Sequence, residues 1–269
     1  MSDSHWIDIG VNLTDSSFDK DRDEVFRNAL EADVQQLIVT GTSLEESLLA
    51  VELCQHNPAN LYCTVGVHPH YAKDHSTDQL SELKALSNEP CVVAIGETGL
   101  DFNRNFSTPE KQLQAFEYQL ELATETSLPL FLHEREAHKR QLELLSYYRD
   151  DFPNAVAHCF TGSREELFNY LDLDLYIGVT GWICDERRGE ELQKLVKEIP
   201  SDRLLLETDA PYLIPRDMRP KPKSRRNLPI YLPHIAHRVA QLCQIDIEVL
   251  KNQTTLNAQT LFKLPPLMS

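Results

Sequence analysis

The feature that most constrains the fold of this chain is an alternation, repeated eight times, between short apolar runs and longer amphipathic stretches. The apolar runs are rich in β-branched residues and predict strands at residues 6–12, 36–41, 61–67, 92–97, 130–133, 155–159, 175–180 and 204–209. Helices are expected between them, for example over 21–32 and 109–126, where Ser107-Thr-Pro-Glu supplies an N-cap and an early proline. Strands that alternate with helices form parallel sheets, so this α/β chain is predicted to be a single (β/α)₈ TIM barrel over residues 1–269.

The alternative arrangement is an open, doubly wound parallel sheet. Such a sheet usually carries a glycine-rich phosphate loop after its first strand, and Gly10-Val-Asn-Leu-Thr is not a loop of that kind. The length of 269 residues is also close to the ~250 residues typical of a TIM barrel. Both observations favour the barrel.

The composition excludes several classes of protein. No apolar run approaches the ~18 residues that a membrane span needs, so no membrane association is expected. Residues 1–8 show no basic segment followed by an apolar one, so no secretory signal is expected either. The six cysteines include no C-x-x-C pair and lie partly within apolar runs, which predicts buried, reduced thiols in a cytoplasmic protein. No obligate protein partner is indicated.

The charge balance is strongly acidic except in one segment. With 42 Asp and Glu against 26 Lys and Arg, the net charge is −16, so any contact with a nucleic acid must be local. Residues 211–233 hold six of the fifteen prolines and a single acid, Asp217. The cations of this segment are Arg216, Arg219, Lys221, Lys223, Arg225 and Arg226. We expect a stiff basic loop over the barrel mouth; the alternative is a solvated surface loop whose charges are balanced by nearby acids.

Polar residues follow the apolar strands at the point where each strand ends. The five residues in this position are His68, Glu97, His133, His158 and Asp209. Because the C-terminal ends of parallel strands face one side of a barrel, these side chains are expected to converge on one pocket. One such histidine alone is more often a hydrogen-bonded core residue, but buried carboxylates need a charged partner or a metal. A bound divalent cation would provide a common partner for all five side chains.

The types of ligand limit the choice of metal and suggest roles. Imidazole nitrogens with carboxylate oxygens suit Mg²⁺, Mn²⁺, Fe²⁺ or Zn²⁺. Glu97 could bridge two metal positions, and two metals ~3.5–4 Å apart stabilise the attacking and leaving oxygens of phosphodiester hydrolysis. Asp209 could ligate the metal or accept the proton of the attacking water. Glu207, two residues earlier on the same strand face, could play either part, or it is an interior carboxylate paired with a base.

Four separated motifs, in this order, resemble those of the TatD family of metal-dependent deoxyribonucleases. They are Gly66-Val-His-Pro-His70, Ile95-Gly-Glu-Thr-Gly-Leu-Asp101, His158-Cys-Phe-Thr-Gly162 and Leu206-Glu-Thr-Asp-Ala-Pro-Tyr212. Residues 101–109 and 182–189 are similar to the bacterial members after which the family is named. The resemblance covers nearly the whole chain. It implies a TIM barrel of the metal-dependent hydrolase superfamily, in the cytoplasm, with Mg²⁺-dependent 3′→5′ exonuclease activity on single-stranded DNA or RNA.

The resemblance also implies roles for individual residues. The metal ligands of the family pattern correspond to Glu97, His133, His158 and Asp209. His68 would contact the scissile phosphate, and Glu207 would support catalysis.

One position departs from the wider family. Most members end their first strand with a His-x-His pair, whereas this chain has Gly10-Val11-Asn12. Glycine offers no ligand, and Asn12 offers a neutral carbonyl oxygen. One metal position is therefore expected to be weaker, more hydrated, or empty until substrate supplies phosphate oxygens. The preference for metal shifts from Zn²⁺ toward Mg²⁺ or Mn²⁺.

Contacts to a single-stranded substrate are expected from three kinds of residue. The imidazoles of His68 and His70 would approach the phosphate, and Arg225 and Arg226 would grip the backbone of the strand. The aromatic residues that could stack on a terminal base are Phe102, Phe160, Trp182 and Tyr212. Phe102 and Tyr212 are preferred because they directly follow metal motifs. Core packing is the alternative for each aromatic side chain.

Two other functions stay open at this stage. The same scaffold supports hydrolysis of small esters, lactones, amides or phosphotriesters, in many cases with a carboxylated lysine on the fourth strand. Residues 92–101 contain no lysine, which favours the nucleic-acid substrate. A barrel that lost its His-x-His pair could instead serve as a binding surface without activity. The presence of Glu97, His133, His158 and Asp209 argues against that alternative.

Overall fold

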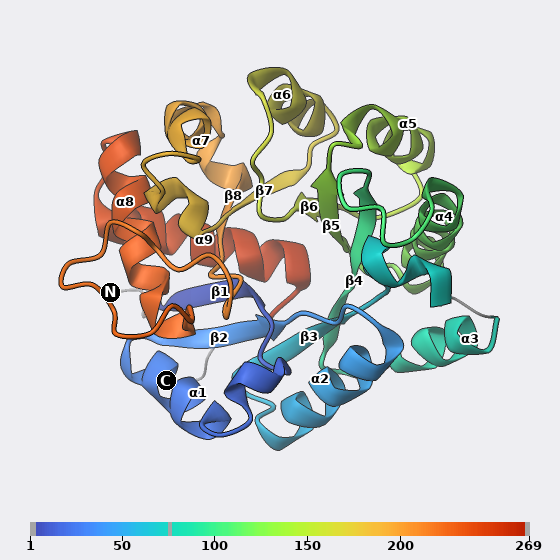
Figure 1. Cartoon of the computed structure of the whole chain (residues 1–269), viewed down its shortest axis with the longest axis horizontal. Helices are drawn as coiled ribbons and strands as arrows, with labels where there is room; N and C mark the ends of the chain where they lie inside the picture. Colours follow the sequence, from blue (N-terminus) through green and yellow to red (C-terminus); the bar gives the residue numbers. More distant parts are fainter. Residues whose placement is uncertain (1–3, 75–76, 267–269) are drawn as a thin grey trace. The chain divides into compact units, whose positions relative to one another are not determined.

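Eight strands form one sheet in the residues that the computed structural model describes, 4–74 and 77–266. The strands follow one another in the sheet in chain order (Figure 1). The pairs β1–β2, β3–β4, β4–β5, β5–β6 and β7–β8 are parallel. They are β1 Trp6–Val11, β2 Val34–Val39, β3 Leu61–Val65, β4 Val92–Asp101, β5 Leu130–Arg135, β6 Ala155–Ala157, β7 Tyr176–Val179 and β8 Leu204–Leu206. All eight predicted strands are confirmed.

Helices separate successive strands and follow the last one. They are α1 Arg22–Glu31, α2 Leu44–His56, α3 Thr77–Leu86, α4 Pro109–Thr126, α5 His138–Tyr148, α6 Arg164–Asp172, α7 Glu190–Leu195, α8 Leu232–Cys243 and α9 Ile247–Phe262. Helix α4 has the predicted bounds, because Thr108 caps it by accepting from the Lys111 N–H and Pro109 occupies its first turn. None of the helices in the described ranges combines the length and the apolar character that crossing a membrane requires.

The ends of β8 and β1 are joined by backbone hydrogen bonds. The Asp209 N–H donates to the Gly10 carbonyl oxygen, and the Asn12 N–H donates to the Ala210 carbonyl oxygen, each at 2.8 Å. The first and last strands of the sequence are therefore neighbours. Strands in chain order whose last member lies beside the first define a (β/α)₈ barrel, so the predicted fold class is confirmed.

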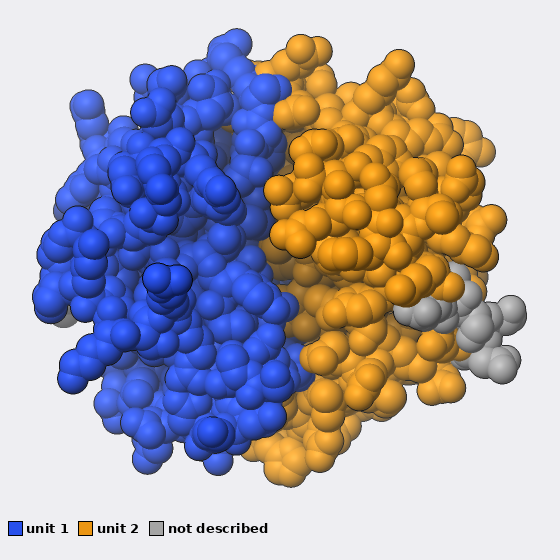
Figure 2. Space-filling model, in the orientation of Figure 1, with its two compact units in different colours: residues 1–39, 159–164, 177–269 blue, residues 40–158, 165–176 orange. Residues whose placement is uncertain are grey.

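The chain divides into two compact units, which Figure 2 colours separately. Unit 1 comprises residues 1–39, 159–164 and 177–269, and it carries β1, β2, β7 and β8. Unit 2 comprises residues 40–158 and 165–176, and it carries β3 to β6. The single domain over residues 1–269 stays a prediction.

The strands form the buried interior of each unit. Every residue of β1 and β8 in unit 1, and of β3 and β4 in unit 2, is buried. Burial on both faces is typical of parallel strands covered by helices, and it explains why these strands are near-continuous apolar runs. Polar side chains within such strands are correspondingly few, and each needs a partner.

The cysteines differ from expectation in their burial. All six are free thiols, as predicted, and Cys54, Cys63 and Cys184 are buried. The prediction of burial was wrong for the other three, which are half-buried: Cys91, Cys159 and Cys243. The reason is their position, because Cys91 precedes β4, Cys159 lies just beyond β6, and Cys243 is the last residue of α8.

Candidate active site

Strand β4 places a glutamate between the neighbouring strands of unit 2. Gly96 has φ +146°, a conformation that residues with a Cβ rarely adopt, and a Cβ there would lie 2.3 Å from the Phe131 carbonyl oxygen. Glycine at this position therefore permits the close approach of β4 to β5. The Glu97 N–H donates to the Gly41 carbonyl oxygen at 2.7 Å, which fixes the backbone on the other side.

The Glu97 carboxylate is the centre of a cluster of imidazoles. Its Oε1 lies 2.9 Å from His133 Nδ1, 2.9 Å from His158 Nε2 and 3.3 Å from His68 Nε2. The carboxylate is buried, and burial raises its pKa, but the imidazoles outweigh that effect and hold the pKa of Glu97 well below its ordinary value. Four of the five predicted strand-end residues thus lie together within unit 2.

Asp101 is a second carboxylate of this cluster that the sequence analysis did not single out as a ligand. Its Oδ2 lies 2.9 Å from His70 Nε2 and 3.4 Å from His133 Nε2. Burial opposes its ionisation, yet hydrogen bonds from the Arg104 N–H and His70, together with the nearby His133 ring, lower the pKa of Asp101. The signal was present in the sequence, because residues 97, 99 and 101 share one face of a strand. The predicted strand ended at 97, four residues before β4 ends.

His133 lies between the two carboxylates. Nδ1 faces Glu97, while Nε2 is buried without a hydrogen-bond partner, because its approach to Asp101 at 3.4 Å lacks hydrogen-bond geometry. A neutral imidazole carries one N–H and can donate to only one of the two. One ligand atom each from His68, Glu97 and His133 lies within 4.8 Å of the others. This set of nitrogen and oxygen donors fits a divalent cation.

His68 is a neutral imidazole with a defined tautomer. Burial lowers the pKa of His68 to about 4, and His133 and His70 add to the effect against the opposing charge of Glu97. Nδ1 accepts the His70 N–H at 3.1 Å, so the proton of the neutral ring is on Nε2, which faces Glu97. His68 therefore presents an N–H donor at the cluster.

A separate pair of polar residues lies at the joined ends of β1 and β8 in unit 1. The Asn12 Nδ2 donates to Asp209 Oδ1 at 2.9 Å, so the carbonyl oxygen is the atom that Asn12 offers to a cation. Asp209 has φ +54°, an uncommon conformation for a non-glycine residue. Strained residues of this kind persist only where the surroundings fix them, and they cluster at functional sites.

Two further carboxylates of the same unit, those of Glu207 and Asp8, are buried near the same two strands. Glu207 is fully buried and accepts the Cys159 N–H at 2.5 Å. Asp8, on β1, accepts the hydroxyl and the N–H of Thr208 at 2.5 and 2.9 Å. Burial raises the pKa of Asp8 to about 7, and the charge of Glu207 adds to the rise. The sequence analysis missed Asp8; its only signal was an acid inside the apolar run of the first strand.

Replacement of Asp8 by asparagine is expected to change how stability depends on pH. The pKa of Asp8 is about 7 in the folded chain against 3.8 ordinarily, so the folded state binds more protons between these values. The free energy of unfolding of the metal-free wild type therefore falls as the pH rises through this window, by at most ~1.4 kcal/mol per pH unit. Asp8→Asn should remove that fall. Urea unfolding in EDTA at pH 5 and pH 8 measures it, and an unchanged pH slope in the variant would contradict the assignment.

A basic cavity of about 580 Å³ opens in unit 1. Its lining includes four arginines and two aromatic residues: Arg187, Arg188, Arg216, Arg225, Trp182 and Tyr212. Arg188 lies over the Trp182 ring, 5.7 Å from its centre, and Tyr212 is 52% exposed. The 211–233 segment, seen in orange in Figure 1, supplies Tyr212, Arg216 and Arg225 to this cavity, whereas Arg187 and Arg188 were not among the predicted binding residues.

The other predicted contacts lie in different surroundings. Arg226 is half-buried, forms a bidentate ion pair with Asp21 at 2.5 and 2.9 Å, and lies over the Phe18 ring. Phe160 is buried in unit 1. Phe102, in unit 2, lines a smaller hollow of about 330 Å³.

An exposed aromatic residue beside the histidine cluster was also missed. Phe106 is 55% exposed, and its ring meets the His70 ring edge-on at 4.7 Å between centres. The guanidinium of Arg104 lies 5.9 Å from the centre of the same ring. No periodic pattern marks Phe106, because it lies in the irregular stretch between β4 and α4.

A (β/α)₈ barrel whose strand ends bring imidazoles and carboxylates together is an arrangement that metal-dependent hydrolases use. Residues 7–263 match the family described as TatD related DNase. The chain belongs to this family.

Individual relatives agree with this assignment. The chain is 55% identical to the "3′-5′ ssDNA/RNA exonuclease TatD" of Erwinia amylovora, over 96% of this chain and 99% of that protein. It is 52% identical to the protein of the same name from Salmonella typhimurium, over 96% of this chain and 98% of that one. Among solved structures, a TatD family hydrolase of Entamoeba histolytica superposes with a TM-score of 0.88 at 28% identity, covering 97% of this chain and 99% of that one.

Proposed function

We propose that the chain is a divalent-metal-dependent nuclease that removes nucleotides from the 3′ end of single-stranded DNA or RNA. The observation that carries the proposal is the Glu97 carboxylate in contact with three imidazoles, beside an imidazole nitrogen that has no hydrogen-bond partner. The names of the Erwinia and Salmonella relatives support the substrate and the direction.

The residues of unit 2 that would hold the cation are Glu97, His133 and His158, with Asp101 beside His133. A bound divalent cation would polarise the phosphate oxygens and lower the pKa of water. We propose Mg²⁺, with Mn²⁺ as a substitute and Zn²⁺ as less suited, because the His-x-His pair is replaced by Gly10 and Asn12, which removes two imidazole ligands. Binding requires neutral imidazoles, so His133 must release any second proton to the solvent.

His68 is proposed to contact the scissile phosphate rather than to ligate the metal. The proton on Nε2 makes this atom a donor, and a nitrogen that carries a proton is not a ligand. A neutral imidazole can donate to a phosphate oxygen as negative charge increases there, while His70 holds the ring through its N–H. His70, held in turn by Asp101, would support the same contact.

Asp209, Asn12 and Glu207 are proposed to serve the same reaction. The Asn12 amide holds the Asp209 carboxylate, so Asp209 can ligate a cation or accept the proton of the attacking water. Glu207 is proposed to support catalysis from its fully buried position against the Cys159 N–H. Glu207 directly follows β8, and Asp209 lies two residues further along the chain.

The basic cavity of unit 1 is proposed to bind the nucleic-acid strand. Arg187, Arg188 and Arg225 provide charge for phosphates, whereas Arg216 is paired with Asp185 and Glu186. Trp182 and Tyr212 provide surfaces for bases. Phe102, in the hollow beside α5, is proposed as a further residue on which a base can stack. Arg225 would contact the strand directly, whereas Arg226 would act with its guanidinium held by Asp21.

Arg225→Ala is expected to weaken binding of single-stranded DNA several-fold and to lower the salt dependence of binding. Loss of one phosphate contact reduces the slope of log K against log salt by ~0.7 for a single strand. Fluorescence anisotropy across a salt series, in Ca²⁺ to limit cleavage, measures this slope. Arg164→Ala is the matched control, because Arg164 is an exposed arginine paired with Glu198 and lines neither this cavity nor the hollow around Phe102. A slope equal to that of the wild type would remove Arg225 from the binding surface.

The proposal is tested by comparing substrates. Purified chain with Mg²⁺ or Mn²⁺ is given labelled oligonucleotides, a small phosphodiester and a lactone. Hydrolysis of oligonucleotides with little turnover of the small substrates supports the nuclease. Turnover of the lactone or the small ester with every oligonucleotide intact would establish the alternative, a small-molecule hydrolase.

A further inference from the structure

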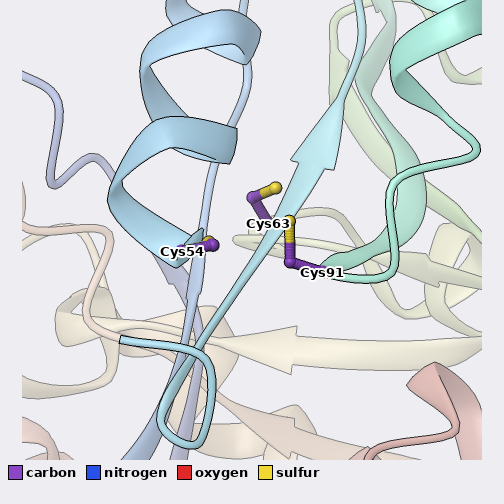
Figure 3. Close-up of side chains that lie close together, drawn as sticks. All are labelled: Cys54, Cys63 and Cys91. Carbon is purple, nitrogen blue, oxygen red and sulfur yellow. The ribbon is translucent and has the colours of Figure 1, made fainter. Parts of the chain in front are cut away.

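A cluster of three cysteines lies outside the candidate active site. Cys54 is in the last turn of α2, Cys63 is on β3, and Cys91 directly precedes β4. Figure 3 shows their side chains together, and the three sulfur atoms lie within 4.8 Å of one another. All three belong to unit 2 but lie toward the beginnings of β3 and β4, whereas His68 follows the end of β3 and Glu97 lies in the second half of β4.

The backbone fixes two of these residues relative to each other. The Cys63 N–H donates to the Cys91 carbonyl oxygen at 2.9 Å, and Cys63 pairs with Val92 in the parallel ladder. Helix α2 brings Cys54 to the same place, and its side chain is fully buried, as is that of Cys63. The arrangement is therefore built from a helix, a strand and the turn residue that directly precedes the neighbouring strand.

The distances suit a metal ion bound by sulfur. A Zn–S bond of about 2.3 Å places the sulfurs of a tetrahedral or trigonal site ~3.8–4.0 Å apart, so the three side chains need only small rotations to close on one ion. Thiolates select soft cations such as Zn²⁺ and Cu⁺ over Mg²⁺. Cys91 is half-buried, which leaves a side from which an ion and a fourth, exogenous ligand can enter.

The surroundings of the cluster affect its three thiols unequally. Hydrogen bonds from Cys54 and Cys63 lower the pKa of the Cys91 thiol, whereas its two neighbours and its burial raise the pKa of Cys63. A thiolate on the accessible member of the cluster is the species that first captures a metal ion. The two buried thiols can then lose their protons to the bound charge.

We propose that Cys54, Cys63 and Cys91 form a three-thiolate site for a soft cation, Zn²⁺ or Cu⁺, independent of the nuclease centre. A bound ion would tie α2 to β3 and to the residue before β4. It would therefore stabilise unit 2 by mass action, in proportion to its concentration above the dissociation constant.

Cadmium reports on the site directly, because a thiolate–Cd²⁺ contact has a charge-transfer absorption in the ultraviolet that imidazole and carboxylate ligands lack. The full chain, reduced with a phosphine and saturated with Mg²⁺, is titrated with Cd²⁺. We expect one equivalent of this absorption in the wild type, and in Cys91→Ser an affinity at least ~100-fold lower, since even outer-shell changes weaken metal sites 10–100-fold. Cys243→Ser is the matched control, because Cys243 is also a half-buried free thiol and is not in the cluster.

Two further measurements distinguish metal binding by the three cysteines from a role of their side chains in packing alone. Zn²⁺ added in the presence of saturating Mg²⁺ should protect Cys91 from alkylation by iodoacetamide, as read by mass spectrometry. It should also raise the melting temperature of the wild type and of Cys243→Ser by more than that of Cys91→Ser. Cu⁺ under anaerobic reduction should give the same pattern. Equal Cd²⁺ absorption in the wild type and Cys91→Ser, or alkylation of Cys91 at the same rate with and without Zn²⁺, would overturn the proposal. None of these readouts depends on nuclease activity.

Discussion

Glu97→Gln is expected to reduce hydrolysis of single-stranded DNA by at least ~10³-fold, the upper range for loss of one preorganised electrostatic group. The substitution keeps the size of the side chain and removes the charge on which His68, His133 and His158 converge. It also removes a metal ligand, so the affinity for Mn²⁺ should fall by well over the ~10–100-fold that follows loss of an outer-shell partner. Initial rates and calorimetric titration with Mn²⁺ measure the two effects.

The matched control for this substitution is Glu125→Gln. Glu125 is an exposed glutamate paired with Lys84 on the surface of unit 2 and lines neither cavity, so its loss should leave rate and metal affinity within about two-fold of the wild type. Circular dichroism and the melting temperature establish that both variants fold. A folded Glu97→Gln chain with near-wild-type activity would contradict the role of Glu97 as the centre of the site.

His68→Ala should separate a phosphate contact from a metal ligand. A donor to a charge that develops in the transition state is worth ~10²–10³-fold in kcat, so kcat should fall by that amount. The affinity for Mn²⁺ should change by less than ~10-fold, because the Nε2 proton of His68 keeps this atom from acting as a ligand. His68→Asn, whose amide can also donate, should recover part of the rate. Rates at saturating metal and calorimetry on the same samples provide the comparison.

The pH dependence gives an independent check on His68. Burial lowers the pKa of His68 to about 4, so the ring is neutral throughout the neutral range and its protonation should not limit activity near the ordinary histidine value of 6.5. An inflection near pH 6.5 that is present in the wild type and absent from His68→Asn would contradict the neutral-donor role. Loss of Mn²⁺ binding in His68→Ala would instead make His68 a ligand.

Much of the fold was predictable because it depends on periodicity. Parallel strands buried on both faces give continuous apolar runs, and β1 and β3 were recognised in this way to within two residues at their ends. Helix α4 was predicted to the residue because its cap and first-turn proline are local signals. Strand β4 was predicted too short, since the residues Glu97-Thr-Gly-Leu-Asp101 do not look like an apolar run although all are buried.

The candidate site was only partly predictable. The expected proximity of His68, Glu97, His133 and His158 is found, because residues at the ends of adjacent parallel strands are neighbours whatever the connecting helices do. Asp101 was hidden by the early end of the predicted strand. Asp8 was hidden because an acid within a buried strand gives no indication of its partner, and the partner, Thr208, is two hundred residues away in sequence.

The basic segment illustrates a further limit of sequence. Its composition indicated that positively charged side chains gather there, but it did not indicate which of them form ion pairs with acids in the folded chain. Arg226 forms its ion pair with Asp21, far away in sequence, whereas the neighbouring Arg225 lines the cavity. Arg187 and Arg188 reach the same cavity from a different connection, which no pattern within residues 211–233 could indicate.

The most direct test of the account is a time course on single-stranded DNA oligonucleotides labelled at either the 5′ or the 3′ end, with Mg²⁺ or Mn²⁺. EDTA and Glu97→Gln serve as the negative controls. We predict that 5′-labelled DNA shortens progressively, that 3′-labelled DNA releases its label at once, and that both controls abolish cleavage. Oligonucleotides that stay intact in the presence of protein with bound metal, or cleavage that persists in Glu97→Gln, would contradict it.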